Sequence, residues 1–239
     1  MGNRQRRSWL LAPVSKAASI AGAARSGADA IVLDLAEFVA EDDKPAARKN
    51  VEAQIKTARA GGAAIYAQID PGSLDADLQA CVHSGLSGVV LTRVESPALV
   101  EQAAARLSAL ESERGIAAGS VKIIAALETA RGNHAAYEIA TANARVSGLT
   151  LGRADLIMDL RPEPSGEIHL LPYLMQRLII VAAAAGVTPI GAWWHAPDRG
   201  LLATPENTDR AARRGRAIGF KGAMCLRADQ VEPLNRAYG

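Results

Sequence analysis

The sequence predicts an α/β protein, a single (β/α)8 barrel (TIM barrel) of parallel strands that spans residues 1–239. Eight short apolar runs recur along the chain, and segments with apolar residues at helical spacing separate most of them. A glycine often stands just before the next apolar run, where the end of a helix needs a residue that tolerates positive φ. Repeated units of strand, helix and glycine are typical of a parallel sheet.

The predicted strands are short and rich in β-branched residues. They cover residues 9–12, 30–33, 64–67, 89–91, 121–127, 146–151, 187–192 and 223–226. Helical spacing is clearest over residues 46–60 and 99–110. The stretch RPEPSGEIHLLP, residues 161–172, is predicted to be a surface loop that precedes a helix over residues 173–185.

The number of strands separates the two common parallel architectures. A doubly wound sheet usually has five or six strands and a glycine-rich fingerprint after the first, and this sequence contains no GxGxxG. Eight units in a chain of this length fit a closed barrel. No shift in composition and no linker divides the chain, so we expect one domain over residues 1–239.

Composition excludes several classes of protein. The net charge of +2 does not favour nucleic acid or an anionic membrane as a partner. No apolar stretch approaches the roughly 20 residues that span a bilayer, and the start, MGNRQRRSWLLAP, lacks the apolar core of an export signal. Cys81 and Cys225 have no metal-ligand spacing, which suits a reducing compartment. We therefore expect a cytoplasmic protein.

Two carboxylates stand out at the ends of consecutive predicted strands. Glu128 closes the fifth strand and Asp155 follows the sixth, one βα repeat later. Because neighbouring strands lie about 4.8 Å apart, the two side chains could hold one cation. Two carboxylates with positions left for water and substrate suit Mg²⁺, and no HxH, HExxH or Cys/His cluster favours zinc. The alternative is that both residues cap the helices that follow them.

Six sequence blocks occur in an order typical of one enzyme family. They are RSWLLAP, SGADAIVLDLAEFVAEDDKPAAR, LTRVES, AALETARG, LTLGRADL and GFKGAMCLRADQVEPLNRAY. From about Arg7 to Tyr238 the chain resembles the citrate lyase β-subunit and malyl-CoA lyase group of HpcH/HpaI-type aldolases. The resemblance implies a Mg²⁺-dependent carbon–carbon lyase that cleaves a small 3-hydroxy dicarboxylic acid or its CoA thioester (citryl-, citramalyl- or malyl-CoA). The products would be a keto acid and an acetyl-CoA-like molecule, and the implied assembly is a homotrimer or homohexamer.

The resemblance also implies roles for individual residues. Glu128 of the ETARG block and Asp155 of the G-x-x-DL block correspond to the Mg²⁺ ligands. The other candidates are Asp34, Arg93 and Arg131 for catalysis, and Glu37, Gln68, Thr129 and Gly132 for substrate binding. The backbone amides of residues 129–132, at a predicted helix start, are candidates to receive a substrate carboxylate. For Arg131 the alternative is an ordinary salt bridge on a helix.

Several positions depart from the family pattern. Ala36 replaces the first acid of the pair in the usual LDLED motif, and Gln68 replaces an arginine that contacts the reacting oxygens in relatives. Arg93 replaces a lysine, which keeps the charge but changes its geometry. Only one short helix is predicted after the eighth strand, so we expect the acid that a C-terminal extension supplies in some relatives to be absent.

These departures leave two other functions open. One is a catalytically reduced paralogue that binds metal or an acyl-CoA as an accessory subunit. The other is a class II aldolase for free hydroxy-keto acids, which needs no CoA site. His195 is a candidate base, Trp193 and Trp194 either wall a pocket or pack, and the arginines at 210, 213, 214 and 216 either meet CoA phosphates or form a solvated helix face.

Overall fold

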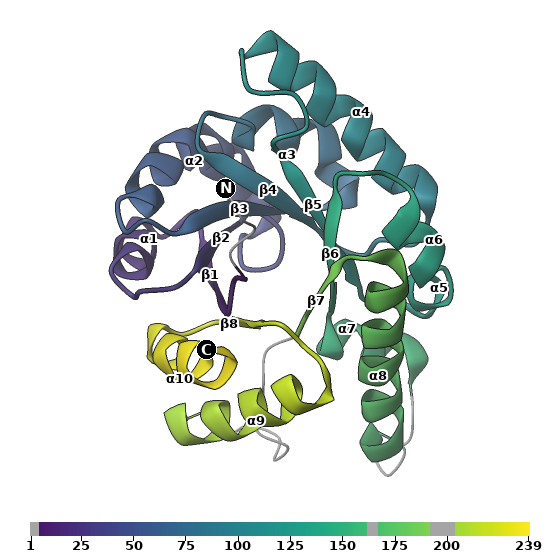
Figure 1. Ribbon diagram of the computed structural model, residues 1–239. Helices are drawn as coiled ribbons and strands as arrows, with labels where there is room; N and C mark the ends of the chain where they lie inside the picture. Colours follow the sequence, from purple (N-terminus) through teal and green to yellow (C-terminus); the bar gives the residue numbers. More distant parts are fainter. Residues whose placement is uncertain (1–4, 162–166, 192–203) are drawn as a thin grey trace.

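The computed structural model describes residues 5–161, 167–191 and 204–239. Eight parallel strands form a nearly closed barrel with helices around it (Figure 1), so the predicted fold class is confirmed. The strands are β1 (Ser8–Pro13), β2 (Ala30–Asp34), β3 (Ala64–Ile69), β4 (Leu86–Leu91), β5 (Lys122–Leu127), β6 (Val146–Leu151), β7 (Thr188–Ile190) and β8 (Ala223–Cys225). Each predicted strand overlaps one of them.

The barrel closes between β7 and β8, which are its shortest strands. Strands β1 to β7 pair in sequence order, and β8 pairs with β1. Gly191 and Ala223 then form an isolated parallel bridge across the remaining seam. There the Gly191 N–H donates to Gly222 O at 2.8 Å, and the Met224 N–H donates to Gly191 O at 2.9 Å. A third hydrogen bond, from the Lys221 N–H to Pro189 O at 3.0 Å, also crosses this seam.

Helices and short 3₁₀ turns connect the strands. The helices are α1 (Ala17–Ala24), α2 (Lys44–Arg59), α3 (Leu74–Cys81), α4 (Pro97–Glu113), α5 (Ala130–His134), α6 (Ala136–Thr141), α7 (Arg153–Leu160), α8 (Glu167–Ala185), α9 (Pro205–Ile218) and α10 (Val231–Tyr238). The turns are η1 (Glu41–Asp43), η2 (Pro71–Ser73) and η3 (Ala228–Gln230). No helix among the described residues is long and apolar enough to cross a membrane.

The predicted loop over residues 161–172 is wrong in its second half, because α8 already begins at Glu167. The prediction treated Pro172 as a boundary, since proline has no N–H to donate within a helix. Pro172 instead lies inside α8. A proline removes one backbone donor but does not prevent residues on both sides of it from being helical.

Two apolar clusters lie on the two faces of the sheet. The larger includes helix residues such as Val51 and Ile55 of α2, and therefore fills the space between sheet and helices. The smaller consists of buried strand residues only, and therefore fills the barrel: Trp9, Leu11, Ala30, Val32, Tyr66, Val90, Ile124, Ala126, Ile190 and Met224. Successive residues of a strand thus point alternately into the barrel and toward the helices. The same alternation determines which polar residues face inward at the carboxyl ends of the strands.

A buried ion pair fixes the amino ends of β5 and β6. Arg145 donates to both carboxylate oxygens of Glu111, at 2.9 and 2.6 Å, and to Val121 O at 3.0 Å. Glu111 also accepts the N–H groups of Gly119 and Val121, both at 2.8 Å. Burial alone would raise the pKa of Glu111, but the hydrogen bonds from Arg145 and the two amides outweigh it and lower the pKa to about 2.

We predict that Glu111→Gln destabilises the fold in a pH-dependent way. Because the pKa in the folded chain lies below its value of about 4.3 in unfolded peptides, the ionised carboxylate stabilises the fold above that value. This stabilisation is lost as the pH falls through about 2. Urea unfolding should show a loss of about 3 kcal/mol at pH 7 and less than half of that at pH 3.

The matched control is Glu113→Gln, because Glu113 is an exposed residue of the same helix. This variant should unfold like the native chain at both pH values. An equal loss at pH 7 and pH 3 in Glu111→Gln would contradict the role given to the ion pair.

Candidate functional site

A layer of buried polar side chains lies at the carboxyl ends of β2 to β5. Asp34 is two residues beyond Val32 and Glu128 is two beyond Ala126, so both continue the inward-facing alternation. Gln68 and Thr92 occupy the corresponding positions after Tyr66 and Val90. All four residues are at most 5% exposed. Barrel enzymes place their chemistry at this end.

A cavity of about 180 Å³ opens at this layer. Its lining combines acids and a cation from the loops after β2 to β5: Ala36, Glu37, Glu41, Asp70, Thr92, Arg93 and Glu128. Of the predicted site residues, the structure therefore brings Glu37, Arg93 and Glu128 to one cavity.

Two local features hold Glu128 in place. Its Oε2 accepts the Arg93 N–H at 2.7 Å, and Arg93 has a left-handed backbone with φ of 46°. That conformation costs a non-glycine residue about 1–2 kcal/mol. On the other side the side chain lies against Gly152, where a Cβ would stand 2.5 Å from Glu128 Cγ and 2.6 Å from Oε1. The missing Cβ of Gly152 leaves the space that the carboxylate occupies.

Gly152 also connects Glu128 to the second predicted metal ligand. It is the N-cap of α7, and Asp155 lies in the first turn of that helix. The Asp155 side chain is outside the described part of the structure, so the metal pair stays a prediction. The alternative that Glu128 caps the next helix is wrong, because the N-cap of α5 is Thr129, whose Oγ1 accepts the Gly132 N–H at 3.1 Å.

The site suits a hard cation better than a soft one. No group of three or more His, Cys, Asp or Glu side chains arranged for a metal occurs among the described residues. A site with few protein ligands, such as one or two carboxylates with water and substrate, is the usual arrangement for Mg²⁺. Glu128, whose carboxylate lies in the space left at Gly152, fits that description.

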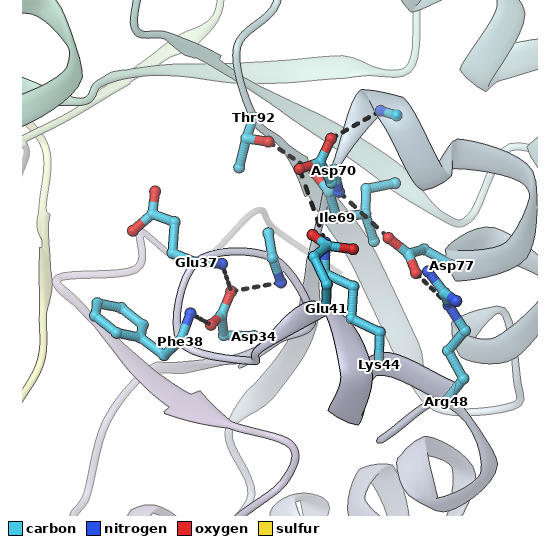
Figure 2. A network of polar contacts seen from close by, with 12 residues as sticks. Asp34, Glu37, Phe38, Glu41, Lys44, Arg48, Ile69, Asp70, Asp77 and Thr92 are labelled. Carbon is cyan, nitrogen blue, oxygen red and sulfur yellow. Dashed lines mark hydrogen bonds and ion pairs between the residues drawn. The ribbon is translucent and has the colours of Figure 1, made fainter. Parts of the chain in front are cut away.

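Asp34 organises the loop that follows β2. Its Oδ1 accepts the N–H groups of Ala36 at 3.0 Å and Glu37 at 3.1 Å, and its Oδ2 accepts the Phe38 N–H at 2.6 Å. Figure 2 shows these bonds gathered on one fully buried carboxylate. Burial raises the pKa of Asp34, and the three amides oppose that rise. Asp34 thereby sets the position of Glu37 at the cavity.

A charged network borders the same cavity. The Arg93 guanidinium donates to Asp70 Oδ2 at 2.7 Å, and Lys44 Nζ lies 4.0 Å from the same oxygen. Lys44 also donates to Glu41, in the same network that Figure 2 draws. The Lys44 side chain is almost fully buried. Sequence reasoning assigned no role to Lys44 or Asp70. The only signals were the place of Lys44 in the DDKPAAR segment and the position of Asp70 after the third strand.

Gln68 faces inward but lines no part of the cavity wall. The side chain is 3% exposed, and its Nε2 has no hydrogen-bond partner among the described residues. Thr150 Oγ1 on β6 is likewise buried and without a partner there. Because leaving a buried polar group unpaired costs about 1–3 kcal/mol, these groups are candidates to meet water or a ligand.

At residues 129–132, the predicted site for a substrate carboxylate, groups of the chain itself engage part of the donors. Arg131 is 78% exposed and pairs with Glu95 at 3.6 Å, which is the salt bridge of the alternative interpretation. The Ala130 N–H donates to Asp159 Oδ2 at 2.6 Å, and the Gly132 N–H donates to Thr129. Two of the amides considered for a substrate carboxylate therefore have acceptors within the chain, and α5 has only five residues. Binding by Thr129, Arg131 and Gly132 stays a prediction.

Several further candidates lie elsewhere. Trp193, Trp194 and His195 are outside the described residues. On α9, Arg213 pairs with Asp209 at 2.7 Å. Cys225 is buried, and burial raises the pKa of its thiol to about 12, which suits a structural role.

Comparison with known proteins identifies the family. Residues 7–228 match the model of the HpcH/HpaI aldolase/citrate lyase family. The chain belongs to this family. The predicted resemblance is thus confirmed, and the predicted enzyme class, a carbon–carbon lyase, is the class of the family.

Individual relatives agree with this membership. Citrate lyase subunit beta of Leuconostoc mesenteroides subsp. cremoris is 27% identical over 98% of this chain and 77% of its own length. A (3S)-malyl-CoA thioesterase of Cereibacter sphaeroides is 28% identical over 97% of this chain and 76% of its own. The structure of protein CitE from Mycobacterium tuberculosis in complex with magnesium, acetoacetate and coenzyme A is 25% identical, with a TM-score of 0.75 over 98% of this chain and 81% of that one.

We predict that Asp34→Ala loosens the loop after β2. The change removes the acceptor of three backbone amides, so hydrogen exchange at residues 36–38 should accelerate at least tenfold. The stability should fall by about 2 kcal/mol, which is at the upper end for the loss of a capping carboxylate. Exchange mass spectrometry and urea unfolding measure the two effects.

The control for this variant is Asp42→Ala, because Asp42 is an exposed residue of η1 in the same loop. It should leave both quantities near their native values. Unchanged protection of residues 36–38 in Asp34→Ala would show that the loop does not depend on this carboxylate.

Proposed function

We propose that the chain is a Mg²⁺-dependent carbon–carbon lyase acting on a small 3-hydroxy dicarboxylic acid or its CoA thioester. The proposed products are a keto acid and an acetyl-CoA-like molecule. The main support is the buried Glu128 carboxylate at the mouth of a cavity, in a chain of the aldolase/citrate lyase family. The relative solved with magnesium, acetoacetate and coenzyme A adds support for the ligands.

In this proposal Glu128 and Asp155 hold the ion. Glu128 is prepared for that role because the Arg93 N–H and the space at Gly152 already orient its carboxylate. When bound, Mg²⁺ would supply stabilisation of the negative charge that develops on substrate oxygens.

The remaining residues would orient the substrate. Arg93, held by Asp70 at the cavity, would receive the substrate carboxylate. Gln68 would donate its Nε2–H, which has no partner among the described residues, to a substrate oxygen from the barrel side. Asp34 would act through the loop that it holds, placing Glu37 at the cavity. For Thr129, Arg131 and Gly132, binding is supported only by their positions in the ETARG block.

One specific observation favours a second function, that of an accessory paralogue with little turnover. The family resemblance implies an arginine where this chain has Gln68, and the charge of Arg93 is already engaged by Asp70. A neutral amide stabilises an oxyanion less than a cation does. Such a protein would still bind metal or an acyl-CoA. An aldolase for free hydroxy-keto acids is the remaining possibility, and assembly as a homotrimer or homohexamer in the cytoplasm stays a prediction.

We predict that the purified chain releases keto acid from at least one of citryl-, citramalyl- and malyl-CoA, and only with Mg²⁺ present.

Glu128→Ala and Asp155→Ala should each abolish Mg²⁺ binding in calorimetry while the circular dichroism spectrum stays native. Gly152→Ala should weaken Mg²⁺ binding about tenfold or more, because its new Cβ displaces the Glu128 carboxylate.

The matched control is Glu138→Gln, because Glu138 is exposed on α6. It should bind Mg²⁺ with native affinity. Undiminished Mg²⁺ affinity in Glu128→Ala would exclude the metal assignment. Mg²⁺ binding without keto acid from any of the three thioesters would point to the accessory paralogue, whereas turnover of free acids alone would point to the aldolase.

A further inference from the structure

The end of the barrel opposite Glu128 contains a second and larger cavity, of about 700 Å³. Its lining comes from the starts of the strands and the segments just before them: Gln5, Arg6, Trp9, Tyr66, Leu86, Ser87, Ser120, Lys122, Ile124, Ser147, Thr188, Ile190 and Lys221. Lys122 and Thr188 are the first residues of β5 and β7, whereas Glu128 follows the last residue of β5. The two cavities thus lie at opposite ends of parallel strands.

Two small residues lie on the inner face of the barrel, and atoms of neighbouring strands pack against both of them. Barrel interiors are usually filled by layers of bulky branched side chains. Here β4 and β6 carry Gly88 and Gly148 inside, and no β6 residue belongs to the inner apolar cluster. A Cβ on Gly88 would stand 2.6 Å from the Tyr66 ring, so the glycine also lets that ring lie across the barrel.

The cavity is strongly cationic. Arg6, Lys122 and Lys221 line it, no carboxylate of a described residue does so, and none of the three cations has an ion pair with a described residue. Four hydroxyl side chains add further donors: Ser87, Ser120, Ser147 and Thr188. Like charges that share one cavity repel each other, and an anion would offset that repulsion.

Contacts within the chain hold the Arg6 side chain and the backbone on both sides of Lys122 in place. The Arg6 guanidinium lies 5.5 Å from the centre of the Tyr66 ring and 6.0 Å from that of Trp9. The Glu111–Arg145 pair holds Val121, next to Lys122, by its N–H and its carbonyl. The Ile123 N–H in turn donates to Arg145 O at 2.8 Å. The cavity is therefore prepared for a ligand before one arrives.

We propose that this cavity binds an oligophosphate anion at a site separate from the lyase site. Guanidinium, ammonium and hydroxyl donors are the groups that bind phosphate, and three cations offset most of the charge of a di- or triphosphate chain. The volume falls in the range of about 300–1,000 Å³ that is typical of small-molecule sites. The Trp9 and Tyr66 rings give the cavity an apolar wall that can take the remainder of a nucleotide.

Calorimetric titration of the full-length chain with inorganic triphosphate, in the absence of Mg²⁺, tests this proposal. The native chain should bind one triphosphate, and the affinity should fall steeply with salt. Arg6→Gln and Lys122→Gln should each weaken binding at least tenfold, and Lys122→Arg should restore most of it. Lys49→Gln, the same charge change on the exposed face of α2, should have no effect.

Three further comparisons make the result specific. Glu128→Ala should bind triphosphate with native affinity, since the two cavities lie at opposite ends. ATP binding more tightly than triphosphate would identify a nucleotide as the ligand, and equal affinity would identify the phosphate chain alone. The proposal is overturned if the native chain does not bind triphosphate, if citrate binds as tightly, or if Lys122→Gln and Lys49→Gln weaken binding equally.

Discussion

A buried carboxylate at the carboxyl end of β5 is the constraint on which the candidate site depends. An ionised side chain that is only 5% exposed must be compensated, because its transfer from water is costly. The described contacts of Glu128 supply part of that compensation through the Arg93 N–H, whose position requires a left-handed backbone. Gly152 supplies the space. Both features are local adaptations to one buried carboxylate.

Alternation along the strands explains how much of this could be predicted from the sequence. Eight apolar runs were enough to predict eight strands. Because every second residue of a strand faces into the barrel, Asp34, Gln68 and Glu128 lie in one layer. The start of α8 could not be predicted, since Pro172 looks like a boundary while the helix continues through it. The pairing of Arg93 with Asp70 was also beyond prediction, because it depends on a loop conformation and not on a periodic pattern.

The structure shows the surroundings of two residues that depart from the family pattern, Gln68 and Arg93. Gln68, where the family resemblance implies an arginine, is a neutral amide whose Nε2 has no partner in the described part of the chain. Arg93 brings a cation to the cavity, but Asp70 neutralises much of its charge. Lys44, nearly fully buried, adds a second cation beside Asp70 and Glu41. At this end Asp70 and Glu41 thus pair with Arg93 and Lys44, whereas the cations that line the cavity at the other end of the barrel have no ion pair with a described residue.

Diffraction from crystals soaked in Mn²⁺, recorded at the manganese absorption edge, tests the central claim most directly. The ion should appear at the carboxyl ends of β5 and β6, with a Glu128 oxygen and an Asp155 oxygen each about 2 Å away, as for Mg²⁺. Anomalous density at that place would establish the two residues as ligands. Density only at other sites, with the Glu128 carboxylate bonded to protein groups alone, would contradict the proposal.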